Sequence, residues 1–162
     1  MEIRPATPAD VAAVVPMVRK LCELHRSWDR AKYDFVDGIE EMYRSWLKNR
    51  AADPRAVFLV ADRQGQAVAF LIGTVEREIP IYRLSEYGFI HDLWVEPEYR
   101  NEGIARQMVM QAVEQFRKIG VKQIRLDTAM PNEAARKLFE SCGFRSSIVE
   151  MLCEIEYKGP SL

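Results

Sequence analysis

The sequence lacks the features that mark several specialised classes of protein. Its three cysteines are odd in number and far apart, so they suggest neither a disulfide framework nor a C-x-x-C metal site. We therefore expect free thiols in a reducing cytoplasm, and no metal. No stretch approaches the roughly 18 apolar residues of a membrane span. The first ten residues, MEIRPATPAD, do not show the charged-then-apolar pattern of a signal peptide.

The sequence also lacks an excess of charge of one sign. It has 23 basic and 24 acidic residues, for a formal net charge of −1. Nucleic acids and membrane surfaces bind basic proteins, so this balance argues against both partners. With 162 residues, 48% of them hydrophobic, the chain is long enough for a core of its own. We expect a single domain over residues 1–162.

The apolar periodicity predicts short strands interspersed with helices. Thr7 and Pro8 suit the start of the first helix, which Pro16 should kink or split, and Asn132 suits the start of the last helix. The expected strands cover residues 2–5, 57–61, 67–75, 87–95, 124–128 and 148–157, and the expected helices cover residues 8–22, 35–50, 107–119 and 133–142. This order, β-α-α-β-β-β-α-β-α-β, predicts an α+β or mixed α/β fold with helices on both faces of a sheet.

One stretch, IHDLWVEPEYRNEGIAR at residues 90–106, has the pattern of a strand that turns directly into a helix. Pro97 stops the strand because proline cannot donate a hydrogen bond to a ladder. The start of a helix leaves backbone N–H groups without partners and carries partial positive charge. Gly103 and the small Ala105 remove side chains that would hold an anion away from those groups. The stretch therefore predicts an anion site suited to a pyrophosphate.

Two motifs in this sequence resemble one known family. Residues 95–105 fit V-x-P-x-x-R-x-x-G-x-A, which is similar to the acyl-CoA-binding motif of the GNAT superfamily of N-acetyltransferases. A nucleotide P-loop would need Lys-Ser/Thr after the glycine, and a dinucleotide fingerprint would need G-x-G-x-x-G. Residues 132–144, NEAARKLFESCGF, resemble the family's later motif, N-x-x-A-x-x-L-Y-x-x-x-G-F. The resemblance covers about residues 56–144 and implies a GNAT-like, largely antiparallel sheet.

The resemblance implies an enzyme that uses acetyl-CoA as its acyl donor. In the family, the pantetheine arm lies beside the strand that corresponds to residues 93–95, and the amides of residues 101–106 would hold the pyrophosphate. Asn132 would lie beside the pantetheine, although it could equally serve only as a helix cap. The residues expected to contact acetyl-CoA are Leu93, Trp94, Val95, Arg100, Asn101, Glu102, Gly103, Ile104, Ala105, Arg106, Asn132 and Phe139.

The implied reaction is direct attack by an amine on the acetyl thioester. Alkyl amines have a pKa near ~10.4, so a base must remove a proton before attack. His91 and Asp92 are the polar residues on the central strand, and strict alternation puts them on opposite faces. His91 then shares a face with Leu93. Asp92 shares the other face with Ile90, unless a β-bulge, which the family often has here, changes the count.

The two candidate bases are not equivalent. His91 is chemically the better general base because its unperturbed pKa is ~6.5, although a purely structural histidine is an equal alternative. Asp92 could instead orient a turn or bind a cationic acceptor. Phe139 stands where the family commonly has a tyrosine that protonates the departing CoA thiolate, and phenylalanine cannot donate a proton. Two functions therefore remain open: an N-acetyltransferase, and a catalytically weak acyl-CoA-binding or regulatory module.

The acceptor amine, of a small molecule or a protein, is not identified by the sequence. Eight acidic residues could recognise a cationic amine: Asp29, Asp34, Asp37, Glu40, Glu41, Glu76, Glu78 and Glu86. Basic residues are interspersed among them, which is typical of a solvated face. The resemblance is also compatible with a homodimer formed through the C-terminal strand or the helices.

Overall fold

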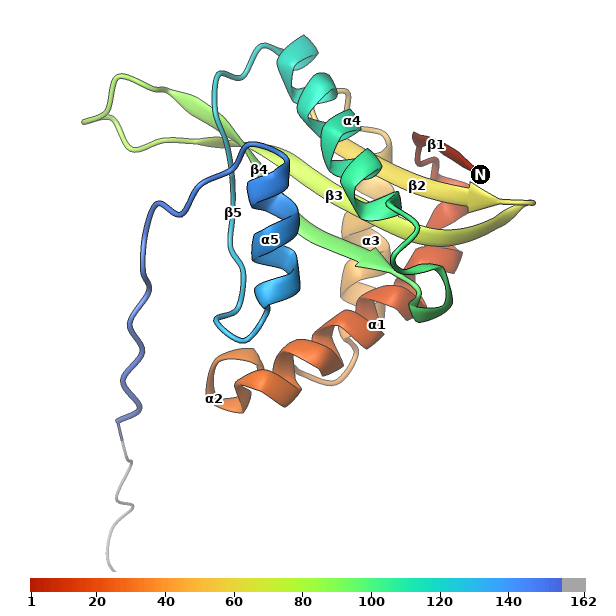
Figure 1. Ribbon diagram of the computed structural model, residues 1–162, viewed down its shortest axis with the longest axis horizontal. Helices are drawn as coiled ribbons and strands as arrows, with labels where there is room; N and C mark the ends of the chain where they lie inside the picture. The colour runs from red at the N-terminus through yellow and green to blue at the C-terminus, as the bar shows by residue number, and fades with distance from the viewer. Residues whose placement is uncertain (156–162) are drawn as a thin grey trace, which may run out of the picture.

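The computed structural model describes residues 1–155, which are built around one five-stranded sheet (Figure 1). In spatial order the strands are β1 (Glu2–Pro5), β2 (Val57–Arg63), β3 (Gln66–Arg77), β4 (Glu86–Val95) and β5 (Ile124–Leu126). Strands β1 to β4 pair antiparallel, and β5 joins β4 in parallel. A parallel pair needs a crossover connection, which helix α4 (Ile104–Ile119) provides. The mixed, largely antiparallel sheet is as predicted.

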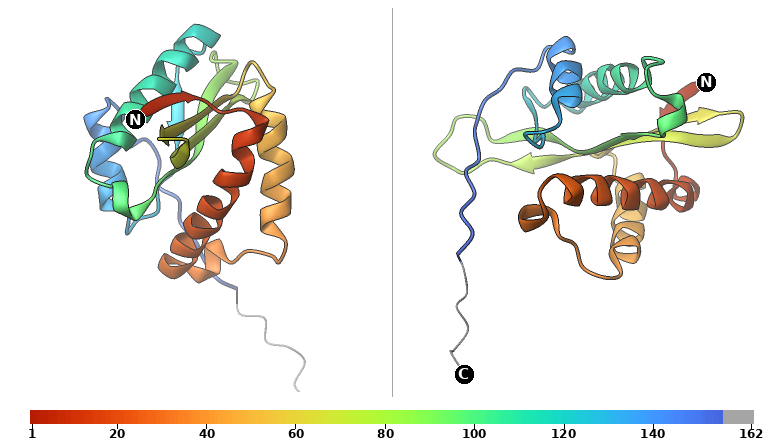
Figure 2. Two further views of the ribbon diagram at one scale, coloured as in Figure 1. Left: turned by 90° about the vertical axis from the view of Figure 1, so that its right-hand side faces the viewer. Right: turned by 60° about the horizontal axis from the view of Figure 1, so that its bottom comes forward.

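Helices cover both faces of this sheet (Figure 2). One face carries α1 (Val11–Trp28), α2 (Arg30–Tyr33) and α3 (Ile39–Ala51), and the other carries α4 and α5 (Glu133–Ser141). Two short 3₁₀ turns, Pro8–Asp10 and Pro97–Tyr99, precede α1 and α4. This arrangement confirms the predicted placement of helices on both faces.

Each face of the sheet has its own hydrophobic core because the central strands are apolar on both sides. The core under α1 and α3 includes Val14, Leu47, Phe58, Phe70, Ile72 and Trp94. The core under α4 and α5 includes Leu59, Leu71, Ile90, Met108, Phe116 and Phe139. β3 lies between the two cores, so neighbouring residues of β3 contact helices from opposite sides.

The contact between Phe116 and two glycines sets how closely α4 approaches the sheet. A Cβ atom at Gly73 of β3 would lie 2.8 Å from Phe116 Cζ, and one at Gly88 of β4 would lie 2.8 Å from the same ring. Any side chain at either glycine would therefore push the ring away. Phe116 is fully buried in this position, so α4 is fixed directly over β3 and β4.

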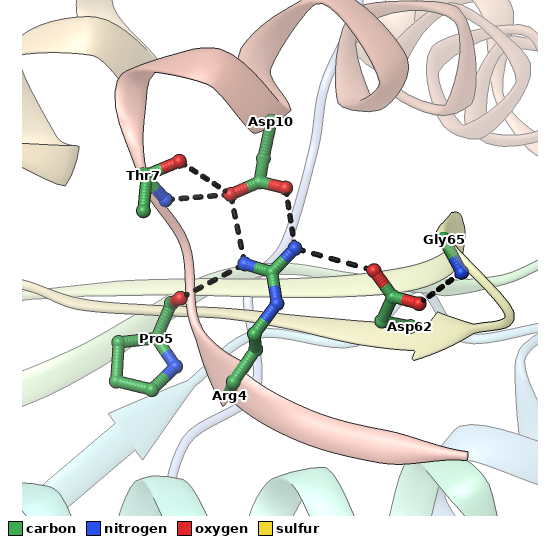
Figure 3. Close-up of polar contacts among 6 residues, drawn as sticks. All are labelled: Arg4, Pro5, Thr7, Asp10, Asp62 and Gly65. Carbon is green, nitrogen blue, oxygen red and sulfur yellow. Dashed lines mark hydrogen bonds and ion pairs between the residues drawn. The ribbon is translucent and has the colours of Figure 1, made fainter.

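An ion-pair network joins β1, β2 and the start of α1 (Figure 3). The Arg4 guanidinium donates two hydrogen bonds to the Asp10 carboxylate, at 2.9 and 2.8 Å, and a third to Asp62 at 3.3 Å. The backbone N–H and the hydroxyl of Thr7 also donate to Asp10, at 2.7 and 2.8 Å. Asp10 therefore organises the first turn that leads from β1 into α1.

The predicted kink or break at Pro16 does not divide α1, which is continuous from Val11 to Trp28. Proline removes the hydrogen bond that its N–H would donate to the carbonyl of Ala12. Both residues are exposed, so water can satisfy that carbonyl. The missing bond is therefore tolerated on the solvent side of the helix.

The predicted last strand, residues 148–157, is not formed over residues 148–155, and residues 156 and 157 lie outside the described part of the chain. The segment is extended and leaves α5 without joining the sheet (Figure 1). Its side chains are largely exposed, including Val149 at 79% and Met151 at 87%. The prediction of a strand here is wrong for residues 148–155, because the segment has no partner strand in residues 1–155. No helix in those residues is both long and apolar enough to cross a membrane.

Candidate functional site

The turn before α4 leaves a row of backbone N–H groups without partners. Asn101 and Gly103 both adopt left-handed backbone conformations, with φ of 65° and 79°. Within the described chain, the N–H groups of residues 101–106 donate to no acceptor, and no side chain caps the helix. The first bonded N–H is that of Gln107, which donates to the Gly103 carbonyl at 3.1 Å. These free donors, with the helix dipole behind them, have the arrangement expected of an anion site, and we refer to residues 101–106 as the candidate anion site.

The surroundings of this turn keep the free N–H groups accessible and reduce nearby negative charge. Ile104 is buried and anchors the start of α4, whereas Gly103 is exposed. Gly103 is required by its positive φ rather than by crowding, because a Cβ atom there would lie 3.8 Å from its nearest neighbour, Gln107 Nε2. The Glu102 carboxylate is paired with Arg63 at 3.1 Å. The negative charge of Glu102, which lies within the turn, is therefore partly neutralised.

The strand that precedes the turn has one free edge. β4 pairs with β5 only over Gly88, Phe89 and Ile90, whereas its pairing with β3 continues to Val95. On the β5 side, residues 92–95 have no strand partner among residues 1–155. Arg100 donates to the Val95 carbonyl at 2.9 Å and stacks over Trp94 at 4.7 Å, which fixes the end of the strand. An unpaired strand edge therefore leads to the candidate anion site.

A β-bulge corrects the prediction that His91 and Asp92 face opposite sides of the sheet. Asp92 pairs with Ile72, and the next pair is Gly73 with Ile90, so His91 has no opposite residue on β3. The extra residue breaks the alternation of β4 and turns both side chains toward α3. His91 therefore does not share a face with Leu93.

Contacts with α3 confirm the outcome of the bulge. The ring of His91 packs against Trp46 with ring centroids 5.3 Å apart, and the Tyr43 hydroxyl donates to Asp92 at 3.3 Å. Tyr43 and Trp46 are three residues apart on α3, so they lie on one face of that helix. The sequence analysis did not identify these aromatics as neighbours of the candidate bases.

His91 lies in a partly buried polar cluster on β3 and β4. Its Nε2 atom is 2.6 Å from Thr74 Oγ1, and Thr74 donates to Glu76 Oε1 at 2.5 Å. Burial lowers the pKa of His91 below its usual value, an effect that the Glu76 carboxylate opposes and the Arg50 guanidinium reinforces. His91 is therefore neutral at neutral pH, as a general base must be.

Asp92 is the more deeply buried of the two candidate bases. Burial raises its pKa to about 6, and the hydrogen bond from Tyr43 partly opposes that rise. Burial also raises the pKa of Tyr43, and it raises the pKa of the nearby Cys22 thiol to about 11. Asp92 therefore exchanges a proton close to neutral pH, whereas Tyr43 and Cys22 keep theirs.

The later motif has a structural role that the contacts define. The Asn132 side chain accepts a hydrogen bond from the Ala135 N–H at 3.1 Å, so Asn132 caps α5 as predicted. Phe139 is buried at 7% exposure and packs against Phe144 with centroids 5.5 Å apart. Its ring is part of the core under α4 and α5.

The acidic residues that could attract an acceptor are mostly ion-paired. Asp34 lies near Arg26 and Arg30, Glu40 pairs with Arg19, Glu41 with Arg44, Glu78 with Arg125 and Glu86 with Arg55.

A hollow of about 440 Å³ lies at the loop between β3 and β4, lined by Arg77, Glu78, Ile79, Pro80, Tyr82, Ser85 and Glu86. Neither His91 nor the turn at residues 101–106 lines it. In residues 1–155, no group of three or more His, Cys, Asp or Glu side chains is placed to hold a metal ion.

Comparison with known proteins points to one family. Residues 20–144 match the family described as the Acetyltransferase (GNAT) family. The spermidine N(1)-acetyltransferase of Vibrio cholerae is 32% identical over 120 residues, which are 72% of this chain and 63% of that protein. A mutant of the BH1408 protein from Bacillus halodurans has a TM-score of 0.85 at 21% identity, covering 96% of this chain and 100% of that chain. A predicted acetyltransferase from Clostridium acetobutylicum, solved with acetyl-CoA, has a TM-score of 0.76 at 19% identity, covering 94% and 95% of the two chains.

Proposed function

Because the chain belongs to the GNAT family of acetyltransferases, we propose that it moves an acetyl group from acetyl-CoA to a primary amine by direct attack. The observation that carries this proposal is the row of unpartnered N–H groups at residues 101–106, next to the free edge of β4. A strand edge suits the amides of a pantetheine arm, and a helix start suits a pyrophosphate. The acyl donor would thus lie along β4 with its thioester toward the bulge.

The residues at the bulge would supply the base. In the proposed step, His91 takes a proton from the attacking amine, the new C–N bond forms, and the C–S bond breaks with its electron pair on the CoA sulfur. His91 suits this role because burial keeps it neutral. Asp92, on the same face and with a pKa of about 6, is the second candidate and could also attract the cationic form of the amine.

One observation favours a second candidate function. Phe139 cannot protonate the departing thiolate, and its ring is buried in the core. General-acid help is typically worth about 10²–10⁴-fold, so a chain without it could be a slow enzyme or an acyl-CoA-binding module. The CoA thiolate is a tolerable leaving group that water can protonate, so we favour the enzyme.

The acceptor is proposed only as a class, a primary amine of a small molecule or a protein. The similar Vibrio cholerae protein is named for spermidine, which makes a polyamine a natural member of the first test panel. We also propose that residues 1–162 form one catalytic domain. A cytoplasmic location is supported by the three cysteines, which are free thiols.

A homodimer is supported by two complementary features of the described chain. The outer edge of β5 has no partner strand, and residues 148–155 expose Ile148, Val149, Met151, Leu152 and Ile155. An open sheet edge can accept an extended segment of another chain as an additional strand, so residues 148–155 of one copy could pair with β5 of another. Light scattering at several concentrations would test this, since a monomeric mass throughout would contradict the dimer.

Release of CoA thiol from acetyl-CoA against a panel of amines tests the proposed function. The panel should contain polyamines, aminoglycosides, amino acids and N-terminal peptides, and acetyl-CoA binding should be measured by calorimetry alongside. Turnover with any amine would support the transferase and identify its acceptor class. Tight binding without turnover across the panel would favour the acyl-CoA-binding module. Absence of binding would contradict both functions.

A further inference from the structure

We propose that Thr74 and Glu76 of β3 are positioning residues that hold neutral His91 with its proton on Nε2 and its lone pair on Nδ1. This inference rests on the proposed function, in which His91 is the base, and adds which nitrogen accepts the proton. It also assigns a role to two residues that the sequence motifs do not include.

The position of Thr74 is unusual for its residue type. It lies at 5% exposure in a strand whose neighbouring buried residues are apolar. A buried hydroxyl without partners would destabilise the fold, so its contacts matter. Thr74 Oγ1 lies 2.6 Å from His91 Nε2 and 2.5 Å from Glu76 Oε1. Both distances are at the short end for hydrogen bonds, so the hydroxyl bridges the two groups.

The donor and acceptor inventory allows one arrangement of protons. The Glu76 side chain is 44% exposed, where water stabilises the ionised carboxylate, and an ionised carboxylate only accepts hydrogen bonds. The single hydroxyl proton of Thr74 must therefore point to Glu76. The contact between Thr74 Oγ1 and His91 Nε2 then needs a proton on the nitrogen, so His91 Nε2 is the donor. Neutral imidazole carries one proton, which leaves the lone pair on Nδ1.

The same chain of contacts would stabilise the product of proton transfer. When Nδ1 takes a proton from the attacking amine, His91 becomes an imidazolium that still donates through Nε2 to Thr74. The Glu76 carboxylate, 3.7 Å from Nε2, then faces a positive charge. This attraction favours the charged ring without a further proton transfer.

Other groups around His91 contact its ring or influence its pKa but form no hydrogen bond with Nε2. Trp46 on α3 and Phe89 on β4 contact the ring edge-on, at centroid distances of 5.3 and 5.0 Å. Arg50 on α3 disfavours the imidazolium, and Asp92 is the adjacent carboxyl group on β4. Within the described chain, Thr74 is the hydrogen-bond partner of the His91 ring.

Nitrogen NMR of the imidazole rings tests the proposal directly. The chain has two histidines, so a His25→Gln variant assigns the signals. Above the pKa of His91, we expect Nδ1 at the chemical shift of an unprotonated nitrogen and Nε2 at that of a protonated one. In Thr74→Val the two shifts should move toward each other as both tautomers become populated, and Thr74→Ser should restore the wild-type shifts.

The carboxylate is tested by a matched pair of variants. Glu76→Gln removes the charge near His91, so the pKa of His91 should fall, as followed by the same NMR signals. Glu78→Gln removes a carboxylate two residues further along the chain, which is paired with Arg125, and it should leave the His91 signals unchanged. If Thr74→Val does not fold, this pair and Thr74→Ser still test the inference.

Kinetics provides a second readout once an accepted amine is known. Thr74→Val should lower kcat by about 10-fold, part of the effect of a general base, and leave the KM for acetyl-CoA unchanged. A proton on Nδ1 in the wild-type protein, or an unchanged tautomer in Thr74→Val, would overturn the proposal. The NMR result does not depend on turnover, so a failed acetyl-transfer assay would contradict the proposed function without obscuring the tautomer.

Discussion

Gly103 and Gly38 offer a matched pair of substitutions that separate backbone strain from loss of the anion site. Each glycine immediately precedes a helix, Gly103 before α4 and Gly38 before α3. Their φ angles are 79° and 82°, and a Cβ atom at either position would meet no atom closer than 3.8 Å. A Gly→Val change at either position therefore imposes similar backbone strain, and the added Cβ atom has room at both positions. Only the change at Gly103 adds a side chain beside the free N–H groups of residues 101–106.

The structure sets the expected magnitudes. Valine at a positive φ costs about 1–3 kcal/mol of folding stability. In a chain of this size, each kcal/mol lowers Tm by about 2–4 °C, so both variants should melt about 2–12 °C below the wild type. Gly103→Val should also block at least one hydrogen bond to the pyrophosphate. A hydrogen bond to a charged group is worth about 1.5–3 kcal/mol, so acetyl-CoA should bind about 10- to 150-fold more weakly.

Calorimetric titration with acetyl-CoA, together with thermal melts of the free proteins, would check both values. Gly38→Val should lose stability and keep its affinity, and Gly103→Val should lose both. Equal acetyl-CoA affinities in the two variants would refute the assignment of residues 101–106 as the pyrophosphate site. A much larger loss of stability in Gly103→Val would indicate that the turn has a structural role beyond its φ angle.

Three further changes probe the base, the leaving group and the fold. His91→Ala should lower kcat by about 10²-fold with unchanged acetyl-CoA affinity, and wild-type turnover would remove His91 from the mechanism. Phe139→Tyr should raise turnover in the thiol-release assay if protonation of the thiolate limits the rate, and no gain would indicate another slow step. Asp10→Asn should destabilise the fold by about 1–2 kcal/mol in urea titrations at pH 7, a value discounted because Arg4 is partly exposed. The Arg4 guanidinium holds the pKa of Asp10 well below its usual range, so this contribution is complete above the unfolded value of ~3.9 and is lost as pH falls below it. A stability difference that is the same at pH 7 and pH 2.5 would contradict this explanation.

The parts of the site that could be predicted from sequence are those set by local residues. The turn at residues 101–106 depends on a glycine, a preceding proline and the start of a helix, all within one short stretch. The cap by Asn132 is equally local. Both were visible in the sequence because each requires particular residue types at fixed spacing.

The parts that could not be predicted depend on how distant segments pair. The bulge at His91 is a property of the register between β3 and β4, and strict alternation along β4 gave the wrong face. The contact of Thr74 with His91 joins residues 17 positions apart, although a threonine within an apolar strand was a signal that could have drawn attention to it. For residues 148–155, the sequence showed β-propensity but not whether a partner strand exists.

The close packing of Phe116 against Gly73 and Gly88 has a thermodynamic consequence. Through this contact, the helix that begins at residue 104 packs directly against the strand that carries His91, with no side chain between the ring and either glycine. The two ends of a long donor molecule would therefore meet protein groups whose separation is already fixed. Little backbone entropy would therefore be lost when acetyl-CoA binds. Any entropy cost of ordering the protein in the ternary complex would arise in the segments that bind the amine.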